Sequence, residues 1–132
     1  MIEFGTGGWR AKIGEEFTKT NIQLLAQAIA DLMIEQGFDN KGFVIGYDRR
    51  FLSAKAAKWL AEVLSANGIK VYFIEKISPT PLIMHAVKEY GTFYGAAITA
   101  SHTPADYNVV KLFTNGGRDA TEEVTDEIEK KI

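Results

Sequence analysis

One short segment, TASHTP at residues 99–104, places a hydroxyl and an imidazole side by side. It follows an apolar run, residues 93–99, that is typical of a buried strand, so we expect the hydroxyl of Ser101 to be displayed where that strand ends. Adjacent residues rarely form a well-oriented nucleophile–base pair, and no third member is evident, so Ser101 and His102 do not indicate a hydrolase triad. The alternative to a functional role is structural: Ser101 forms a turn and His102 lies on the surface.

A second segment, FGTGGWR at residues 4–10, combines three glycines with an arginine. Glycines allow backbone amides to approach an anion, and the guanidinium fork of Arg10 matches phosphate oxygens. The segment lacks the Lys-Ser/Thr ending of a P-loop, and it lacks the third glycine and preceding strand of a dinucleotide fingerprint. The sequence therefore indicates either phosphate recognition or an ordinary glycine-rich turn.

Charged residues mark two further places. Lys111 lies in the otherwise apolar run 107–113, where a lysine costs desolvation unless it sits at an edge or faces an anion. An edge lysine that discourages aggregation is the alternative. Asp48, Arg49 and Arg50 follow the apolar run 42–47, where they could serve a site or form surface salt bridges.

The elements that must position these residues follow from hydrophobic periodicity. Apolar residues at three- and four-residue steps predict helices, and short apolar runs bounded by turn residues predict strands. The helices are predicted over 18–36, 53–67, 81–90 and 122–131, and the strands over 42–47, 69–74, 93–99 and 107–113.

The order of these elements predicts an α/β fold. The first three strands are joined through helices and should be parallel with right-handed crossovers, whereas the fourth follows after a loop and should be antiparallel. We therefore expect a three-layer α/β/α domain with a small, mixed, mostly parallel four-stranded sheet whose last strand is antiparallel. Chemistry in such sheets collects in loops beyond the carboxyl ends of the strands.

Composition narrows the classes of function. The 132 residues suit one domain, and a net charge of −2 does not favour a nucleic-acid partner. The absence of cysteine excludes thiolate chemistry, and the 2 histidines cannot form a three-histidine metal site. No apolar run is long enough to span a membrane and no signal peptide is evident, so a cytoplasmic location without a membrane partner is expected.

Four segments taken together resemble the α-D-phosphohexomutases, which include phosphoglucomutase and phosphomannomutase. Residues 4–10 are similar to the family's Phe-Gly-Thr-x-Gly-x-Arg motif, and residues 46–50 to its Gly-x-Asp-x-Arg motif. Residues 99–104 resemble the active-serine loop, Thr-Ala-Ser-His-Asn-Pro, and residues 108–111 resemble Asn-Gly-x-Lys. The departures are Ala11, Thr103 and Val109, and none of them removes an obligatory chemical group.

The resemblance implies a phosphoryl-transfer mechanism. The serine at the position of Ser101 is carried as a phosphoserine, which donates its phosphoryl group to a hexose monophosphate. The hexose 1,6-bisphosphate then turns around and returns its other phosphate to the serine. A phosphoserine adds about −1.5 to −2 charge to its loop and requires cationic partners.

The same resemblance implies roles for further residues. Arg10 and Lys111 are expected to be catalytic, with Lys111 as proton donor and electrostatic clamp, and His102 to orient the phosphoserine or contact substrate. Thr6 and Arg50, together with Arg10, are expected to bind phosphate. Mg²⁺ is expected to bind an oxygen of the phosphoserine, with its other ligands on aspartates outside this chain.

The resemblance spans all 132 residues but only the first of four family domains. We therefore expect an N-terminal domain that is inactive alone, whose partners are the missing domains of the same enzyme and a hexose phosphate. Glucose is the preferred sugar and mannose is possible. The alternatives are a non-catalytic sugar-phosphate-binding module and a purely structural α/β domain.

Overall fold

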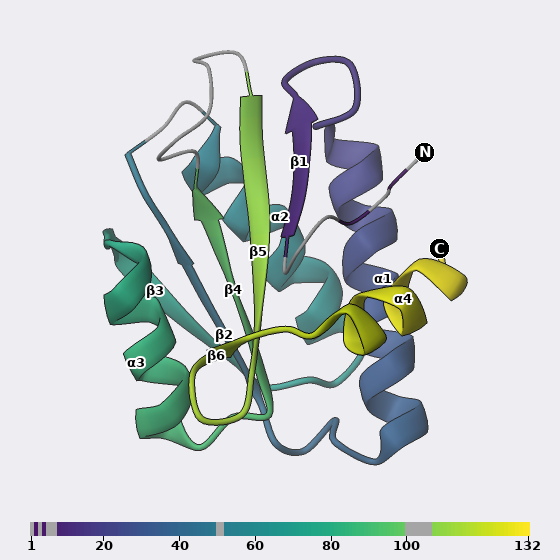
Figure 1. Ribbon diagram of the computed structural model, residues 1–132, viewed down its shortest axis with the longest axis vertical. Coiled ribbons are helices and arrows are strands. Elements are labelled where there is room, and N and C mark those ends of the chain that lie inside the picture. Colours follow the sequence, from purple (N-terminus) through teal and green to yellow (C-terminus); the bar gives the residue numbers. More distant parts are fainter. Residues whose placement is uncertain (1, 3, 5–7, 50–51, 100–106) are drawn as a thin grey trace.

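The computed structural model describes residues 2, 4, 8–49, 52–99 and 107–132, and its elements form a sheet with helices on both faces (Figure 1). In chain order they are β1 (Gly8–Lys12), α1 (Lys19–Gln36), β2 (Phe43–Tyr47), α2 (Ser53–Ala66), β3 (Val71–Ile77), α3 (Thr80–Tyr90), β4 (Tyr94–Thr99), β5 (Tyr107–Thr114), β6 (Arg118–Asp119) and α4 (Glu122–Lys130).

The strands are ordered β1-β5-β4-β2-β3, and β6 pairs with β5. The predictions that β2, β3 and β4 are parallel and that β5 is antiparallel to β4 are confirmed. The prediction of a mostly parallel sheet is wrong, because β5 also pairs antiparallel with β1 and β6. This sheet is therefore mixed and only partly parallel.

The prediction of four strands is also wrong, since the sheet has six. The periodicity analysis predicts no strand in the segment containing β1, which has no continuous apolar run. Instead, Trp9 and Ala11 alternate into the core at 1% exposure each, which is the period-two pattern of a half-buried strand. The sixth strand, β6, is only 2 residues long and is too short to carry a periodic signal.

Two hydrophobic clusters form the layers on either side of the sheet. The larger one joins α1, α2 and α4 to the inner side chains of the strands, including Phe43, Ile45 and Val110. The smaller one lies under α3 and contains Val44, Ile83, Val87, Ala97 and Phe113. The predicted three-layer α/β/α arrangement is thus confirmed, with α3 on the face opposite α1 and α2 (Figure 1).

Glycines in two central strands let α3 approach the sheet closely. A Cβ atom added to Gly46 would lie 2.5 Å from the side chain of Ile83, and one added to Gly95 would lie 2.4 Å from the side chain of Val87. Because real Cβ atoms essentially never make such contacts, a larger residue at either position would force Ile83 or Val87 to shift. The approach fixes α3 beside β2 and β4.

Both ends of α1 are capped. The hydroxyl of Thr18 accepts a hydrogen bond from the backbone N–H of Asn21, and Gly37 ends the helix in the left-handed conformation. At the start of α3, Pro81 occupies the first turn, where its missing N–H leaves no helical hydrogen bond unmade.

Candidate functional site

The parallel strands bring two predicted site segments to one edge of the sheet. β2 ends at Tyr47 and is followed by Asp48 and Arg49, whereas β4 ends at Thr99 and leads into residues 100–106. Since β2 and β4 are neighbouring parallel strands, their carboxyl ends meet at the same edge, which is uppermost in Figure 1. This is where ligands bind in open α/β sheets. We call residues 48–53 the arginine segment and residues 99–108 the serine segment.

A network of polar side chains joins these two segments. The hydroxyl of Thr99 donates a hydrogen bond to Oδ2 of Asp48 at 2.8 Å, and the hydroxyl of Ser53 donates to Oδ1 of the same carboxylate at 3.0 Å. Nδ2 of Asn108 lies 3.3 Å from the oxygen of Ser53. A serine hydroxyl has one proton, so when it donates to Asp48 it must accept from Asn108. The hydrogen bonds therefore converge on the carboxylate of Asp48.

The partners of Asp48 in this network are buried although they are polar. Ser53 and Asn108 are 0% exposed and Thr99 is 5% exposed. Burying hydroxyl and amide groups is costly unless they are hydrogen-bonded, and here each has a partner within the network. The backbone N–H of Asp48 also donates to the carbonyl of Ile98 at 3.0 Å, which extends the pairing of β2 with β4 past the end of the strand.

The arginine segment contains a strained residue. Leu52, which precedes the first residue of α2, has a φ of 68°, and it is the single non-glycine residue with positive φ among those that the structure describes. The left-handed conformation costs about 1–2 kcal/mol for such a residue. Strain of this kind persists only where surrounding contacts over-determine the backbone. The hydrogen bond between Asp48 and Ser53, on either side of Leu52, is one such contact.

The antiparallel pair β1–β5 places Arg10 and Lys111 on one face of the sheet. Arg10 is in register with Val109, and Gly8 with Lys111. Residues directly opposite one another share a face, and so do alternate residues of one strand. Arg10 and Lys111 are therefore diagonal neighbours on adjacent strands. The Cα atoms of such neighbours are about 7–8 Å apart.

These two cations differ in their surroundings. Arg10 is exposed, and its guanidinium carbon lies 5.3 Å from the centre of the Tyr107 ring, a cation–π contact that orients the side chain without neutralising its charge. Lys111 is half-buried. The face thus presents one exposed and one partly sheltered cation, an arrangement that suits an anion.

The remaining predicted site residues, Thr6, Arg50, Ser101 and His102, lie outside the described residues. The structure places Arg10 and Lys111 together and places the described ends of the serine and arginine segments together. The roles predicted for all six residues stay predictions.

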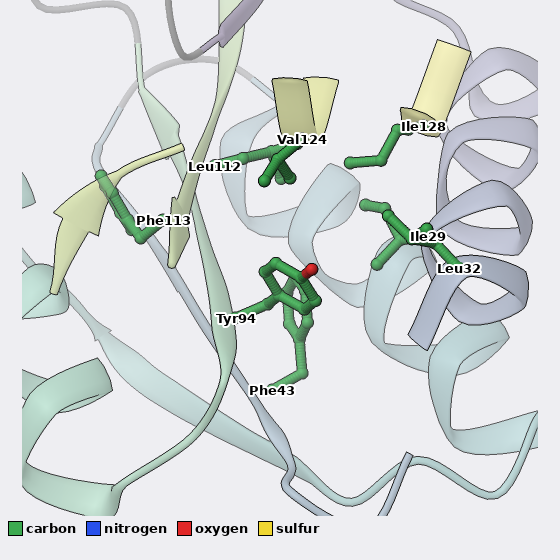
Figure 2. A pocket seen from close by; sticks show the side chains of 8 residues that line it. All are labelled: Ile29, Leu32, Phe43, Tyr94, Leu112, Phe113, Val124 and Ile128. Carbon is green, nitrogen blue, oxygen red and sulfur yellow. The ribbon is translucent and has the colours of Figure 1, made fainter. Parts of the chain in front are cut away.

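An internal space beneath α4 is a packing gap and not a ligand site. It measures about 10 Å³ and is lined by apolar side chains and the ring of Tyr94 (Figure 2). A cavity of this size scarcely admits one water molecule. Tyr94, at the base of this space, donates a hydrogen bond from its hydroxyl to Oε1 of Gln36 at 2.7 Å, and burial raises the pKa of its phenol.

Two further kinds of site, for a metal ion and for a membrane, concern all the residues that the structure describes. No group of three or more His, Asp or Glu residues is placed to hold a metal ion within the described ranges. Across the same residues, no helix is both long enough and apolar enough to cross a membrane.

Sequence comparison assigns the chain to a family. A family model described as "Phosphoglucomutase/phosphomannomutase, alpha/beta/alpha domain I" matches residues 1–132. The chain belongs to this family. The resemblance found in the four sequence motifs is thereby confirmed.

Individual relatives agree with the family assignment. A Schizosaccharomyces pombe protein assigned as a probable phosphoribomutase is 40% identical over 121 residues, which are 88% of this chain and 21% of that protein. A Staphylococcus haemolyticus phosphoglucomutase is 36% identical over 134 residues, or 99% of this chain and 24% of that protein. This domain I chain thus spans between a fifth and a quarter of the length of these curated relatives.

A solved structure has the same fold. A Thermus thermophilus protein assigned as a phosphomannomutase superposes with a TM-score of 0.93 at 36% identity, covering 98% of this chain and 29% of that one. The mixed sheet and three-layer arrangement are therefore those of the domain I family.

Sequence reasoning missed the polar network of this domain. Asp48, Thr99 and Asn108 lie in motifs that carry the resemblance, but the resemblance assigns no specific role to them, and Ser53 is predicted only as part of a helix. The available signal was a polar residue directly after each of two apolar runs and another at the start of a helix. That signal does not reveal which of these side chains meet in the folded domain.

Proposed function

We propose that this chain is the first domain of a phosphohexomutase that interconverts hexose 1-phosphate and hexose 6-phosphate. In this proposal Ser101 carries the migrating phosphoryl group, and a hexose 1,6-bisphosphate is the intermediate and activator. The remaining domains of the enzyme are contributed by polypeptide outside these 132 residues. Family membership and the similarity to a phosphoglucomutase support the reaction class.

One structural observation carries the proposal furthest: Arg10 and Lys111 share a sheet face beside the strand that leads into Ser101. Val109, the register partner of Arg10, pairs on its other side with Thr99, two residues before Ser101. Preorganised cations stabilise the charge that spreads over phosphoryl oxygens during transfer. In the proposed mechanism Lys111 is the proton donor and electrostatic clamp, and Arg10 binds phosphate.

The other predicted residues complete the proposed site. Thr6 and Arg50 bind phosphate, and His102 orients the phosphoserine or contacts the sugar. Mg²⁺ is proposed to bind an oxygen of phosphorylated Ser101, with its aspartate ligands outside this chain. Without those ligands, the 132-residue chain alone is expected to bind the ion weakly and to be inactive.

The test uses the longer protein that carries this domain. We expect mass spectrometry of the purified protein to find a phosphate on Ser101, and we expect Ser101→Ala to lower mutase turnover by several orders of magnitude in a coupled assay. Near-normal turnover of the variant would disprove the proposed role. A wild-type protein without turnover that still binds glucose 1,6-bisphosphate would instead favour the non-catalytic binding module.

A pentose phosphate is a second candidate substrate. Glucose is our preferred sugar, but the relative with 40% identity is assigned as a probable phosphoribomutase. The two substrates are distinguished by comparing kcat/KM for glucose 1-phosphate, mannose 1-phosphate and ribose 1-phosphate. A preference for the ribose compound of tenfold or more, about 1.4 kcal/mol in transition-state binding, would replace the hexose assignment.

A further inference from the structure

The carboxylate of Asp48 connects the two chain segments that lead into the proposed reaction site. Thr99 and Asn108 lie at the two ends of the serine segment, and Asp48 and Ser53 lie at the two ends of the arginine segment. The hydrogen bond from Ser53 closes the arginine segment onto Asp48, and the hydrogen bond from Thr99 attaches the serine segment to the same carboxylate. Each carboxylate oxygen thus serves one segment.

The carboxylate of Asp48 offers a separate oxygen to each of the two hydroxyls. A carboxylate can accept from both at once, whereas an amide offers one oxygen and turns its donor toward the other hydroxyl. Asn108 extends the connection to the far end of the serine segment, because its amide lies 3.3 Å from the oxygen of Ser53. The network therefore fixes both ends of the serine segment relative to the arginine segment.

We propose that Asp48 is a positioning residue for phosphoryl transfer, which acts through Thr99 and Ser53 to hold the described ends of the serine segment next to those of the arginine segment. This inference rests on the proposed function, since the serine segment contains Ser101 and the arginine segment contains Arg50. A phosphoryl group and its cationic partner must be aligned closely in the transition state. In this role the half-buried Asp48 supports the two segments and contacts neither the sugar nor the phosphate.

The test removes one hydroxyl from the network and keeps the shape of the side chain. Thr99→Val replaces the hydroxyl with a methyl group, and Thr99→Ser keeps the hydroxyl and removes the methyl group. The matched control is Thr92→Val, just before the opposite end of β4. Thr92 is also buried, at 1% exposure, and its hydroxyl has no hydrogen-bond partner in the described part of the chain.

The variants are made in the longer protein, with glucose 1-phosphate as substrate and glucose 1,6-bisphosphate as activator. We expect Thr99→Val to lower kcat on the order of 10–100-fold with KM nearly unchanged, because misplacement of a reacting group weakens the transition state more than substrate binding. Thr99→Ser should restore kcat to within a few-fold of wild type, and Thr92→Val should leave it at the wild-type value.

A purely structural role for Thr99 predicts a different pattern. If Thr99→Val kept the wild-type kcat, or if Thr99→Ser were as impaired as Thr99→Val, the inference would be overturned. An equal loss in Thr92→Val would also overturn it, because any buried hydroxyl would then have the same effect. If Thr99→Val does not fold, kcat of the Ser53→Ala variant is measured instead. A reduced kcat supports the inference, and an unchanged kcat overturns it.

The wild-type protein separates this inference from the proposed function. A wild-type protein with mutase turnover and phosphorylated Ser101, combined with unaffected Thr99→Val and Ser53→Ala variants, would reject the role of Asp48 alone. A wild-type protein with neither turnover nor a phosphate on Ser101 would reject the proposed function and this inference together.

Discussion

Arg10 and Thr99 occupy one row of the sheet, with Val109 between them in register with both. Arg10 belongs to the amino-terminal strand, whereas Thr99 ends a central strand much later in the chain, at the base of the serine segment. Antiparallel pairing of β5 with both neighbours creates this row. Arg10, whose side chain is exposed, is thereby placed level with Thr99, the last described residue before the proposed phosphorylation site.

The shared face of Arg10 and Lys111 leads to a prediction for Lys111. In the longer protein, Lys111→Met should lower kcat by about 10²–10⁴-fold, because it removes the proposed proton donor and its positive charge while keeping a long, unbranched side chain. Lys41→Met is the matched control. Lys41 is exposed in the turn before β2, at the end of the sheet away from the site, and the same loss of charge there should leave the turnover at the wild-type rate. Equal effects of the two substitutions would contradict a specific role for Lys111.

The close approach of α3 to the sheet predicts that Gly46→Ala destabilises the fold. The new methyl group would meet the side chain of Ile83, and overpacking of this kind costs about 1–3 kcal/mol. The free energy of unfolding of the 132-residue chain in urea is the measurement. Because the three atoms nearest to the added methyl group all belong to Ile83, the double variant Gly46→Ala/Ile83→Ala should be more stable than the sum of the two single effects predicts. If the effects of the two substitutions were strictly additive, the contact with Ile83 would not be the cause of the destabilisation.

The buried phenol of Tyr94 predicts a loss of stability at alkaline pH. Burial is the main cause that raises its pKa above the ordinary value of 10.0. Above pH 10 the unfolded chain loses the phenolic proton while the folded chain keeps it, so the unfolded state binds fewer protons and the free energy of unfolding falls as pH rises. The contribution is fully present below the pKa of the unfolded chain.

Tyr94→Phe should reduce this alkaline loss of stability. The measurement is the free energy of unfolding as a function of pH, paired with an ultraviolet titration of tyrosinate in the folded protein. The variant should also be about 0.5–1.5 kcal/mol less stable at neutral pH, because the hydrogen bond to Gln36 is lost. An identical pH dependence in both proteins would rule out Tyr94 as its source.

Local sequence patterns determined most of the helices and strands that form the three layers. The helical periodicity of Leu25, Ile29 and Leu32 and the caps at Thr18 and Gly37 specify α1 without reference to the rest of the chain. The apolar runs that became β2 and β4 were recognisable because both are buried on two faces, so their side chains show no charged interruptions. Their connection through helices dictated parallel pairing.

Only the tertiary structure decided which residues are neighbours at the candidate site. β1 escaped prediction because a five-residue strand with one exposed face depends on a distant partner, β5, for its sheet hydrogen bonds. The same pairing placed Arg10 in the row of Thr99. The hydrogen bonds from Thr99 to Asp48 and from Asn108 to Ser53 were equally inaccessible, since hydrogen bonds between residues so far apart in the chain have no local periodic signal. Residue types set which groups could take part, and long-range pairing of strands determined which of them meet.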